Sequence, residues 1–353
     1  MSEFNARQSL AATDPRILLN ASRQPSVLPP RLIAAGRALG LATATVAGLG
    51  VASLAWGQCE RRCPTVRHFS IPVPALRQGE ELRILHISDL HLYSGQDFLV
   101  DFLDHVARTE DFDMVMSTGD NFGNATGASL LREAYRPLLA YPGVFVLGSN
   151  DYYTSSTFRP WTHYLRRDAH AVHDTSRLAR LPWRDFVQGL TRASWVDLSN
   201  RCDQLTVRLS HGDRSVAVNL AGVDDPHLER DRMPELPENW DDSDTIRIGV
   251  THAPYRRVLD AFVDRGVDLI CAGHTHGGQI GLPVWGALVT NCDLPPRYAK
   301  GVHTWRHEGA SAPLHVSAGL GTSPWAPVRI ATRPEVSILH LTGPEDVTET
   351  SEG

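Results

Sequence analysis

The residues best suited to chemistry in this chain are histidines and acids that follow short apolar runs. The densest group is Gly-His-Thr-His-Gly-Gly-Gln at 273–279, which follows the apolar run 267–272. Glycines allow a tight turn, and neutral imidazole is the commonest nitrogen ligand for transition metals. A His-x-His pair alone is weak evidence, because most histidines beside glycine turns are ordinary polar residues. Its interpretation therefore depends on what the rest of the chain supplies.

The same arrangement recurs at four other apolar runs. These runs are 82–88, 114–116, 144–147 and 246–250, and they precede Asp89 with His91, Asp120, Asn150 and His252, respectively. In an open α/β sheet, ligands bind beyond the carboxyl ends of the strands, where the loops converge. The sequence therefore predicts one site with mixed oxygen and nitrogen donors, suited to two divalent transition metals. Its expected ligands are Asp89, His91, Asp120, Asn150, His252, His274 and His276.

The apolar spacing also predicts the elements that position these residues. Helical spacing at 98–106 and at 129–139 separates three strand-like runs. Such a β-α-β-α-β series indicates parallel strands with right-handed crossovers, so the fold class is α/β. Further strands are expected at 216–220, 246–250, 267–272, 314–317 and 336–339. The more polar segment 152–200 is predicted to be a helical insertion beside the site.

An uncharged stretch near the N-terminus predicts a membrane helix. Residues 38–59 contain no charged side chain, and as a helix the run 38–56 reaches roughly 30 Å, enough to cross a bilayer. We interpret 38–58 as a single uncleaved anchor that places the protein at the cell membrane. A cleaved signal peptide and a buried domain helix are the alternatives, although the run begins late and no small-x-small cleavage site follows it.

Arginines flank the anchor on both sides, so the positive-inside rule leaves open which side of the membrane the rest of the chain faces. A stripe of small residues at four-residue spacing would also allow two anchors to pair as a weak homodimer. The stripe comprises Gly40, Ala44, Gly48 and Ala52.

The remaining boundaries follow from composition and patterning. Residues 1–37 are predicted to be a flexible tail, 59–81 an extended linker, 82–343 the folded domain and 344–353 a polar tail. The chain is 42% hydrophobic and 21% charged, which are globular values. Its formal net charge of -6 argues against a general nucleic-acid-binding face, because such a face must be basic.

Taken in order, the five ligand blocks resemble the calcineurin-like metallophosphoesterases. The blocks are Asp-x-His, Gly-Asp, an Asn-Asp variant, a single His and Gly-His-x-His, and the resemblance covers residues 82–341. The Gly-His-Thr-His-Gly-Gly-Gln form is most similar to a bacterial branch of membrane-associated phosphohydrolases. The resemblance implies a four-layer α/β/β/α sandwich with a dimetal site between its sheets.

Carried over position by position, the resemblance also implies how the ligands are divided. The first metal would be held by Asp89, His91 and His276, the second by Asn150, His252 and His274, and Asp120 would bridge both. The implied cofactors are two divalent ions of manganese, iron or zinc. A hydroxide between them would attack a phosphomonoester or phosphodiester, so no protein nucleophile is required.

The chain departs from the family at the third block. The family reads Gly-Asn-His followed by Asp or Glu, whereas this chain has Gly-Ser-Asn-Asp at 148–151. A gapless match puts Ser149 at the ligand position and Asn150 at the histidine position. Matching Asn to Asn, the register we prefer, makes Asn150 the ligand and puts Asp151 at the histidine position. The candidate catalytic residues are then Asp151, Asn150 and His227.

Two classes of function follow from these residues. The leading hypothesis is a membrane-tethered dimetal phosphohydrolase, whose phosphoester substrate could be lipid-derived. The alternative is a metal-binding sensor or receptor on the same fold, whose catalysis was lost with the third-block histidine. The other metal-ligand positions are all filled, which favours the enzyme.

Overall fold

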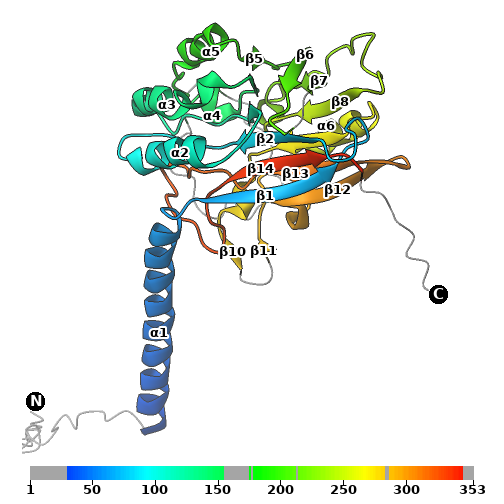
Figure 1. Ribbon diagram of the computed structural model, residues 1–353. Helices are drawn as coiled ribbons and strands as arrows, with labels where there is room; N and C mark the ends of the chain where they lie inside the picture. Colours follow the sequence, from blue (N-terminus) through cyan, green and yellow to red (C-terminus); the bar gives the residue numbers. More distant parts are fainter. Residues whose placement is uncertain (1–29, 155–174, 176–177, 212–213, 283–285, 345–353) are drawn as a thin grey trace, which may run out of the picture. The chain divides into compact units, whose positions relative to one another are not determined.

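The computed structural model describes residues 30–154, 175, 178–211, 214–282 and 286–344 (Figure 1). The contacts within the chain separate two units, 1–52 and 53–353, and the second is called the catalytic unit below. Helix α1 (Pro30–Glu60) begins in the first unit and ends in the second. It therefore starts within the predicted tail, at a proline, the residue favoured in the first turn of a helix.

The part of α1 between Leu39 and Glu60 is long and apolar enough to cross a membrane. Its large apolar side chains are 56–71% exposed. They are Leu39, Leu41, Val46, Leu49, Val51, Leu54 and Trp56. A helix that is apolar on all sides needs an apolar environment, so this segment is suited to lipid.

The catalytic unit contains two six-stranded sheets. The first has the order β1 (Thr65–Pro72), β14 (Glu335–Thr342), β2 (Glu81–Ile87), β3 (Met114–Ser117), β4 (Gly143–Phe145) and β5 (Val196–Asp197). Strands β2 to β5 are parallel, and helices α2 (Asp97–Thr109) and α3 (Ala128–Tyr135) connect the first three. The predicted β-α-β-α-β series is therefore confirmed.

The second sheet has the order β12 (Gly301–His307), β13 (Ala310–Val316), β9 (Leu269–Ala272), β8 (Thr245–Val250), β7 (Ser215–Gly222) and β6 (Arg201–Arg208). Its four central strands are parallel, and β12 and β6 pair antiparallel at the two edges. The shorter elements are α4 (Ser149–Tyr152), α5 (Trp183–Arg192), α6 (Arg256–Val263), β10 (Gly281–Leu282) and β11 (Gly286–Ala287).

The side chains of a strand point alternately to the two faces of its sheet, and this alternation produces the layers of the fold. In β2, Leu82 and Ile84 join the core between the two sheets, whereas Leu85 and Ile87 pack with the helices α2 and α3. Successive side chains of a strand point to opposite faces, so one strand supplies both cores. Helix α6 covers the outer face of the second sheet. The predicted four-layer α/β/β/α sandwich is confirmed.

Segment 59–81 is more than the expected linker. Residues 65–72 form β1, which pairs with β14 along its whole length, and Ile71 is buried between the sheets. Prolines at 64, 72 and 74 obscure this strand in the sequence. Such prolines are tolerated because β1 lies at a sheet edge, where one row of backbone groups needs no partner strand.

The insertion 152–200 contains helix α5, as expected, and also the edge strand β5, which was not expected. Residues 155–174 and 176–177 of this insertion lie outside the described residues, as do 1–29 and 345–353 of the two predicted tails.

Candidate metal centre

The predicted ligand blocks follow strands of both sheets. Asp89 and His91 follow β2, Asp120 follows β3, and Asn150 lies in α4 directly after β4. From the second sheet, His252 follows β8, while His274 and His276 follow β9. The carboxyl ends of these strands bring the side chains into two groups that could each hold a metal ion.

The first group consists of Asp89, His91 and His276. The Nε2 atoms of His91 and His276 are 3.1 Å apart, and Asp89 Oδ1 lies 3.8 Å and 3.5 Å from them. Asp89 Oδ1 is buried and has no hydrogen-bond partner among the described residues. A buried carboxylate oxygen without a donor is costly, so this set of atoms fits a bound cation.

The second group consists of Asp120, His252 and His274. His252 Nε2 lies 3.4 Å from Asp120 Oδ1 and 3.3 Å from His274 Nδ1. The other oxygen of Asp120, Oδ2, lies 3.5 Å from His91 Nε2 in the first group. One carboxylate thus faces both groups, which is the arrangement of a bridging ligand.

Backbone carbonyls orient the second group. His252 Nδ1 lies 2.7 Å from the carbonyl oxygen of Thr118, and His274 Nε2 lies 3.1 Å from that of Asn291. Each imidazole donates its N–H to a carbonyl, which leaves His252 Nε2 facing Asp120 and His274 Nδ1 facing His252. Contacts of this kind fix the tautomer and the ring orientation of metal-binding histidines.

Five of the expected ligands have left-handed backbone conformations. Their φ angles are 51° at Asp89, 41° at His91, 55° at Asp120, 70° at His274 and 50° at His276. Such conformations are uncommon for residues other than glycine and cost about 1–3 kcal/mol each. The fold retains this strain where donor atoms must converge.

Burial and neighbouring charges together decide the charges of the donors. It lowers the pKa of His91 and of His276, and it lowers the pKa of His274 to about 3. These imidazoles are neutral, which is the form that binds metal. Burial opposes the charged forms of Asp120 and His252 as well, but their mutual attraction outweighs it, lowering the pKa of Asp120 and raising that of His252. A metal would take the place of the proton on His252.

Asn150 contacts the carboxylate of Asp120. Its backbone N–H donates to Asp120 Oδ1 at 2.8 Å, and its Nδ2 donates to Oδ2 at 2.7 Å. Oδ2 is the oxygen that faces His91, so the Asn150 amide lies toward the first group. The resemblance assigns Asn150 to the second group instead. Ser149 Oγ is 3.4 Å from the same Nδ2. Both registers of the third block therefore place a polar side chain at the site.

Asp151 is placed differently from a proton donor. It is fully buried, and its carboxylate accepts hydrogen bonds from the backbone N–H groups of Asp120, Asn121 and Gly148 at 2.8–2.9 Å. It thereby joins the turn after β3 to the turn after β4. Burial raises its pKa to about 6, but its oxygens are directed at the backbone. The geometry assigns Asp151 to positioning, in place of the catalytic role expected from the sequence.

His227 lies beside the second group. It follows β7 in the short helix Pro226–Leu228, its Nδ1 is 3.0 Å from Tyr255 Oη, and its ring centre is 4.8 Å from that of His274. The neighbouring Asp225 is fully buried, and within the described part of the chain its Oδ2 has no hydrogen-bond partner. The sequence analysis missed Asp225 as a site residue. Its position after a parallel strand was the available signal.

Arg329 is a buried cation behind the first group. Its Nη2 is 3.3 Å from His276 Nδ1 and donates to the carbonyl oxygens of Gly319 and Gly321 at 3.0 Å and 2.6 Å. Burial lowers the pKa of this guanidinium to about 10. The sequence offers no signal for this residue, because Arg329 belongs to no ligand block and follows no predicted strand.

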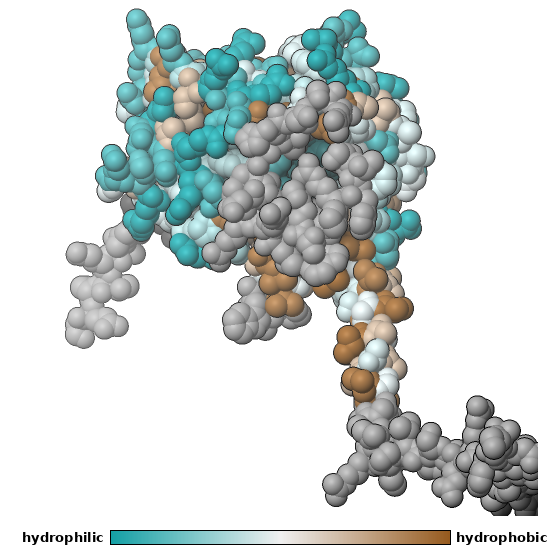
Figure 2. Space-filling model, turned by 180° about the vertical axis from the view of Figure 1, so that it is seen from behind, coloured by the Kyte–Doolittle hydropathy of each residue, from teal (hydrophilic) through white to brown (hydrophobic). Residues whose placement is uncertain are grey.

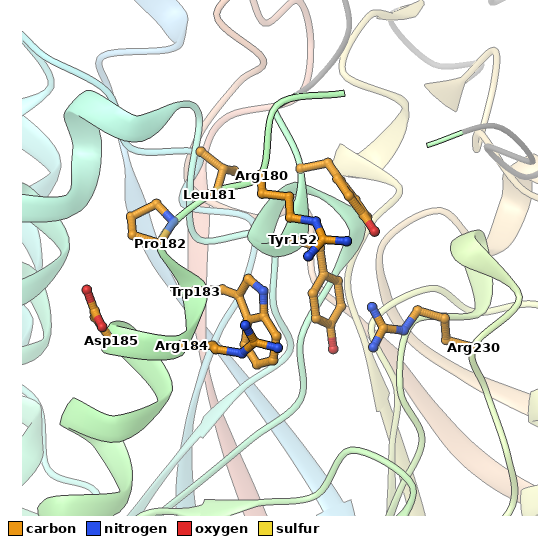
Figure 3. A pocket seen from close by; sticks show the side chains of 9 residues that line it. Tyr152, Arg180, Leu181, Pro182, Trp183, Arg184, Asp185 and Arg230 are labelled. Atoms are coloured by element: carbon orange, nitrogen blue, oxygen red, sulfur yellow. The ribbon is translucent and has the colours of Figure 1, made fainter. Parts of the chain in front are cut away.

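A cationic pocket of about 380 Å³ adjoins α4 (Figure 3). Its lining includes Tyr152, Trp183, Arg180, Arg184 and Arg230. The Arg230 guanidinium lies 3.9 Å from the centre of the Tyr152 ring and forms an ion pair with a neighbouring aspartate at 3.0 Å. Arg180 and Arg184 have no carboxylate partner within the described ranges. The Arg184 guanidinium lies 5.1 Å from the centre of the Trp183 ring, and Asp185 also lines the pocket.

Comparison with known proteins agrees with this geometry. Residues 82–278 match the calcineurin-like phosphoesterase family. The chain is 28% identical to the uncharacterized protein YpbG of Bacillus subtilis over 288 residues, covering 79% of this chain and 88% of that one. It is 26% identical to the metallophosphoesterase YkoQ of the same organism, covering 74% and 84%.

A third relative carries a more specific name. The UDP-2,3-diacylglucosamine pyrophosphatase LpxG of Chlamydia muridarum is 26% identical over 289 residues, covering 73% of this chain and 83% of that one. The family match spans more than half of the present chain. The chain therefore belongs to the calcineurin-like phosphoesterase family and is a metallophosphoesterase, a hydrolase of phosphoric ester bonds.

Proposed function

We propose that this protein hydrolyses a phosphomonoester or phosphodiester at a centre of two divalent metal ions, of manganese, iron or zinc. Asp89, His91 and His276 hold one ion, and His252 with His274 holds the other. The observation that carries this proposal is the position of Asp120, whose two oxygens face one group each. Asn150 completes the site beside the same carboxylate.

When bound, two such ions polarise phosphate oxygens and lower the pKa of a water molecule so that it can attack phosphorus. The residues of this chain hold and orient that chemistry. The carbonyls of Thr118 and Asn291 keep the N–H of His252 and His274 pointing away from the site. Asp151 fixes the turn that carries Asp120, and the Asn150 amide donates to Asp120 Oδ2 and so orients that carboxylate.

We assign protonation of the leaving group to His227. An amide such as Asn150 has no proton to transfer, and the Asp151 carboxylate is occupied by backbone donors. His227 is the candidate whose ring lies against the second group. An imidazole can also transfer a proton, which an amide cannot.

The test of the metal centre is Asp120→Ala. This variant should lose bound metal and reduce turnover of p-nitrophenyl phosphate and bis-p-nitrophenyl phosphate to background. Metal content is measured by mass spectrometry after loading with Mn²⁺ or Zn²⁺. The matched control is Asp111→Ala, since Asp111 is 82% exposed. An Asp120→Ala protein with full metal content and rate would remove the assignment. Wild-type protein that binds both ions but hydrolyses neither ester would favour the sensor hypothesis.

We further propose that the substrate carries a second anionic group, as a pyrophosphate does. Support comes from the pocket beside α4, where Arg180 and Arg184 lack carboxylate partners among the described residues, and from the relative named as a pyrophosphatase. Arg184→Ala should raise KM for a nucleoside diphosphate about tenfold and leave KM for p-nitrophenyl phosphate unchanged, because a charge-assisted hydrogen bond is lost. Arg192→Ala, at the other end of α5, is the control. Equal effects on both substrates would argue against this subsite.

We also propose that the segment Leu39–Glu60 anchors the protein as a single-pass membrane helix. Its length, composition and exposed apolar surface support this proposal. Extraction of the full-length protein from membranes by detergent, but not by alkaline carbonate, is the expected result. Release by carbonate would indicate peripheral attachment instead.

A further inference from the structure

Exposed apolar side chains of the catalytic unit gather in two places. Among the described residues from 53 onward, the large hydrophobic side chains that are exposed are Leu54, Trp56, Leu236, Ile280, Leu282, Leu288 and Trp325. Leu54 and Trp56 lie in the last turns of α1. Ile280, Leu282, Leu288 and Trp325 are 44%, 48%, 51% and 53% exposed, and we call these four residues the apolar rim. Only Leu236 lies elsewhere in this set.

The two stretches that carry the apolar rim lie side by side. Gln279 Nε2 donates to the carbonyl oxygen of Ala326 at 2.7 Å, one residue after Trp325. The N–H of Gly281 donates to the carbonyl oxygen of Ile330 at 2.8 Å. Residues 281–282 pair with residues 286–287 as β10 and β11. The rim is therefore one surface formed by the described residues 279–282, 286–288 and 325–330.

The end of α1 is bonded to this same surface. Arg329 donates its backbone N–H to the carbonyl oxygen of Gly57 at 3.2 Å, and Gln58 Nε2 donates to that of Pro327 at 2.8 Å. The Glu60 carboxylate accepts from the N–H groups of Ala331 and Thr332 at 3.0 Å and 2.6 Å. The point where the apolar helix joins the catalytic unit is thus held next to the rim, and Figure 2 shows hydrophobic residues gathered there.

The same elements carry the first ligand group. His276 lies three residues before Gln279, and its Nδ1 is 3.3 Å from the guanidinium of Arg329, whose backbone contacts α1. On the other side, Arg61 Nη1 is 3.2 Å from Tyr93 Oη, two residues after His91. The end of α1 and the rim therefore adjoin the metal centre through two separate connections.

We propose that the apolar rim rests in the lipid–water interface beside the anchor, so that the metal centre acts on phosphoesters carried by membrane lipids. Soluble proteins rarely leave several large apolar side chains exposed together unless a partner covers them. Trp325 is a tryptophan, a residue type that is enriched at membrane interfaces. Arg61 and Arg62 follow the apolar helix at the level expected for lipid phosphates. A lipid surface is the partner that is continuous with the membrane span of α1.

The lipid substrate in this inference rests on the proposed function. The contact of the apolar rim with the membrane does not. The surface is tested without catalysis. Full-length protein is reconstituted in phosphatidylcholine vesicles with brominated acyl chains, which quench only tryptophans that reach the hydrocarbon region. Trp325→Phe should lower the quenched fluorescence, whereas Trp240→Phe should leave it unchanged, because Trp240 is 2% exposed inside the catalytic unit.

Quenching that is the same with and without Trp325 overturns the surface assignment. The triple variant Leu282→Ser, Leu288→Ser, Trp325→Ser gives a second result that overturns the assignment. In that result the wild type is a dimer, the triple variant is a monomer, and quenching does not depend on Trp325. That result would make the rim a contact between two copies of this chain.

The substrate half is tested by activity with the same triple variant in vesicles. We expect at least a tenfold loss of kcat/KM on vesicle-borne phosphatidic acid or CDP-diacylglycerol, and less than a twofold change on p-nitrophenyl phosphate. Leu236→Ser, also an exposed leucine, should change neither. Wild-type protein that hydrolyses p-nitrophenyl phosphate but neither lipid overturns the lipid substrate. Metal-loaded wild type that hydrolyses none of these esters overturns the proposed function and leaves the quenching result standing.

Discussion

At the scale of single residues, partners decide what a carboxylate does. Asp120 and Asp151 are both buried at the same site. Asp120 turns its oxygens to histidines and Asn150, while Asp151 turns its oxygens to backbone N–H groups. The first therefore fits a metal ligand and the second a brace between two turns.

Replacing Asp151 by Asn separates these roles. The amide keeps one acceptor but directs its NH₂ group at backbone donors, so the free energy of unfolding should fall by about 2–4 kcal/mol. Urea unfolding of metal-free protein measures this change, with the exposed Asp111→Asn as control. A variant with unchanged stability that fails only on esters with poor leaving groups would restore Asp151 as the proton donor.

His227 can be tested through the leaving group. His227→Gln should lower kcat by about 10²–10⁴ for esters of weakly acidic alcohols, because their departure needs a proton. The loss should be small for p-nitrophenyl phosphate, whose leaving group departs unprotonated. His105→Gln, on the exposed side of α2, is the control. If His227→Gln slows all esters equally, His227 supports His274 rather than supplying a proton.

At the scale of elements, the site depends on tight turns after strands. Gly148 ends the turn after β4, and a Cβ atom there would lie 2.7 Å from His252 Nε2 and still closer to Asp120 Oδ1. Real side chains do not tolerate such contacts, so the donors must separate.

Gly148→Ala should therefore lower metal content and activity at least tenfold while the far-ultraviolet circular dichroism stays native. Gly189→Ala is the matched control, because nothing lies within 4 Å of its added Cβ in helix α5. That substitution should raise the free energy of unfolding by about 0.5–1 kcal/mol through helix propensity. A Gly148→Ala enzyme with normal metal content would contradict the geometry of the second group.

At the scale of the whole catalytic unit, the metal centre lies where two sheets meet. Asp89, His91 and Asp120 follow strands of the first sheet, and His252, His274 and His276 follow strands of the second. Bound ions would connect the two sheets at one edge and compensate for the repulsion and strain among their ligands.

Removal of metal should therefore lower the melting temperature. An ion present at a hundred times its Kd contributes about 2.7 kcal/mol, and roughly 2–4 °C is expected for each kcal/mol in a domain of this size. Differential scanning calorimetry with and without a chelator measures the shift. In Asp120→Ala the chelator should have no effect, and an equal shift in that variant would show that metal binds elsewhere.

The order of the elements and the chemistry of the strand ends could be predicted from the amino-acid sequence. Apolar runs predicted β2, β3, β4, β7, β8, β9, β13 and β14, because strands buried on both faces leave a nearly continuous apolar pattern. The edge strands β1, β5, β6 and β12 were missed, since an edge strand needs less burial and tolerates proline or polar residues.

The candidate site divides in the same way. His274 and Asp120 could be selected from the sequence because their positions after strands follow a rule of topology. Tertiary structure alone decided that Asp151 braces the backbone and that Arg329 lies behind His276. Those roles depend on which atoms meet across distant segments, and a linear pattern of residue types contains no such distances. The sequence therefore determined which donors are available, and the packing of the two sheets decided where each one points.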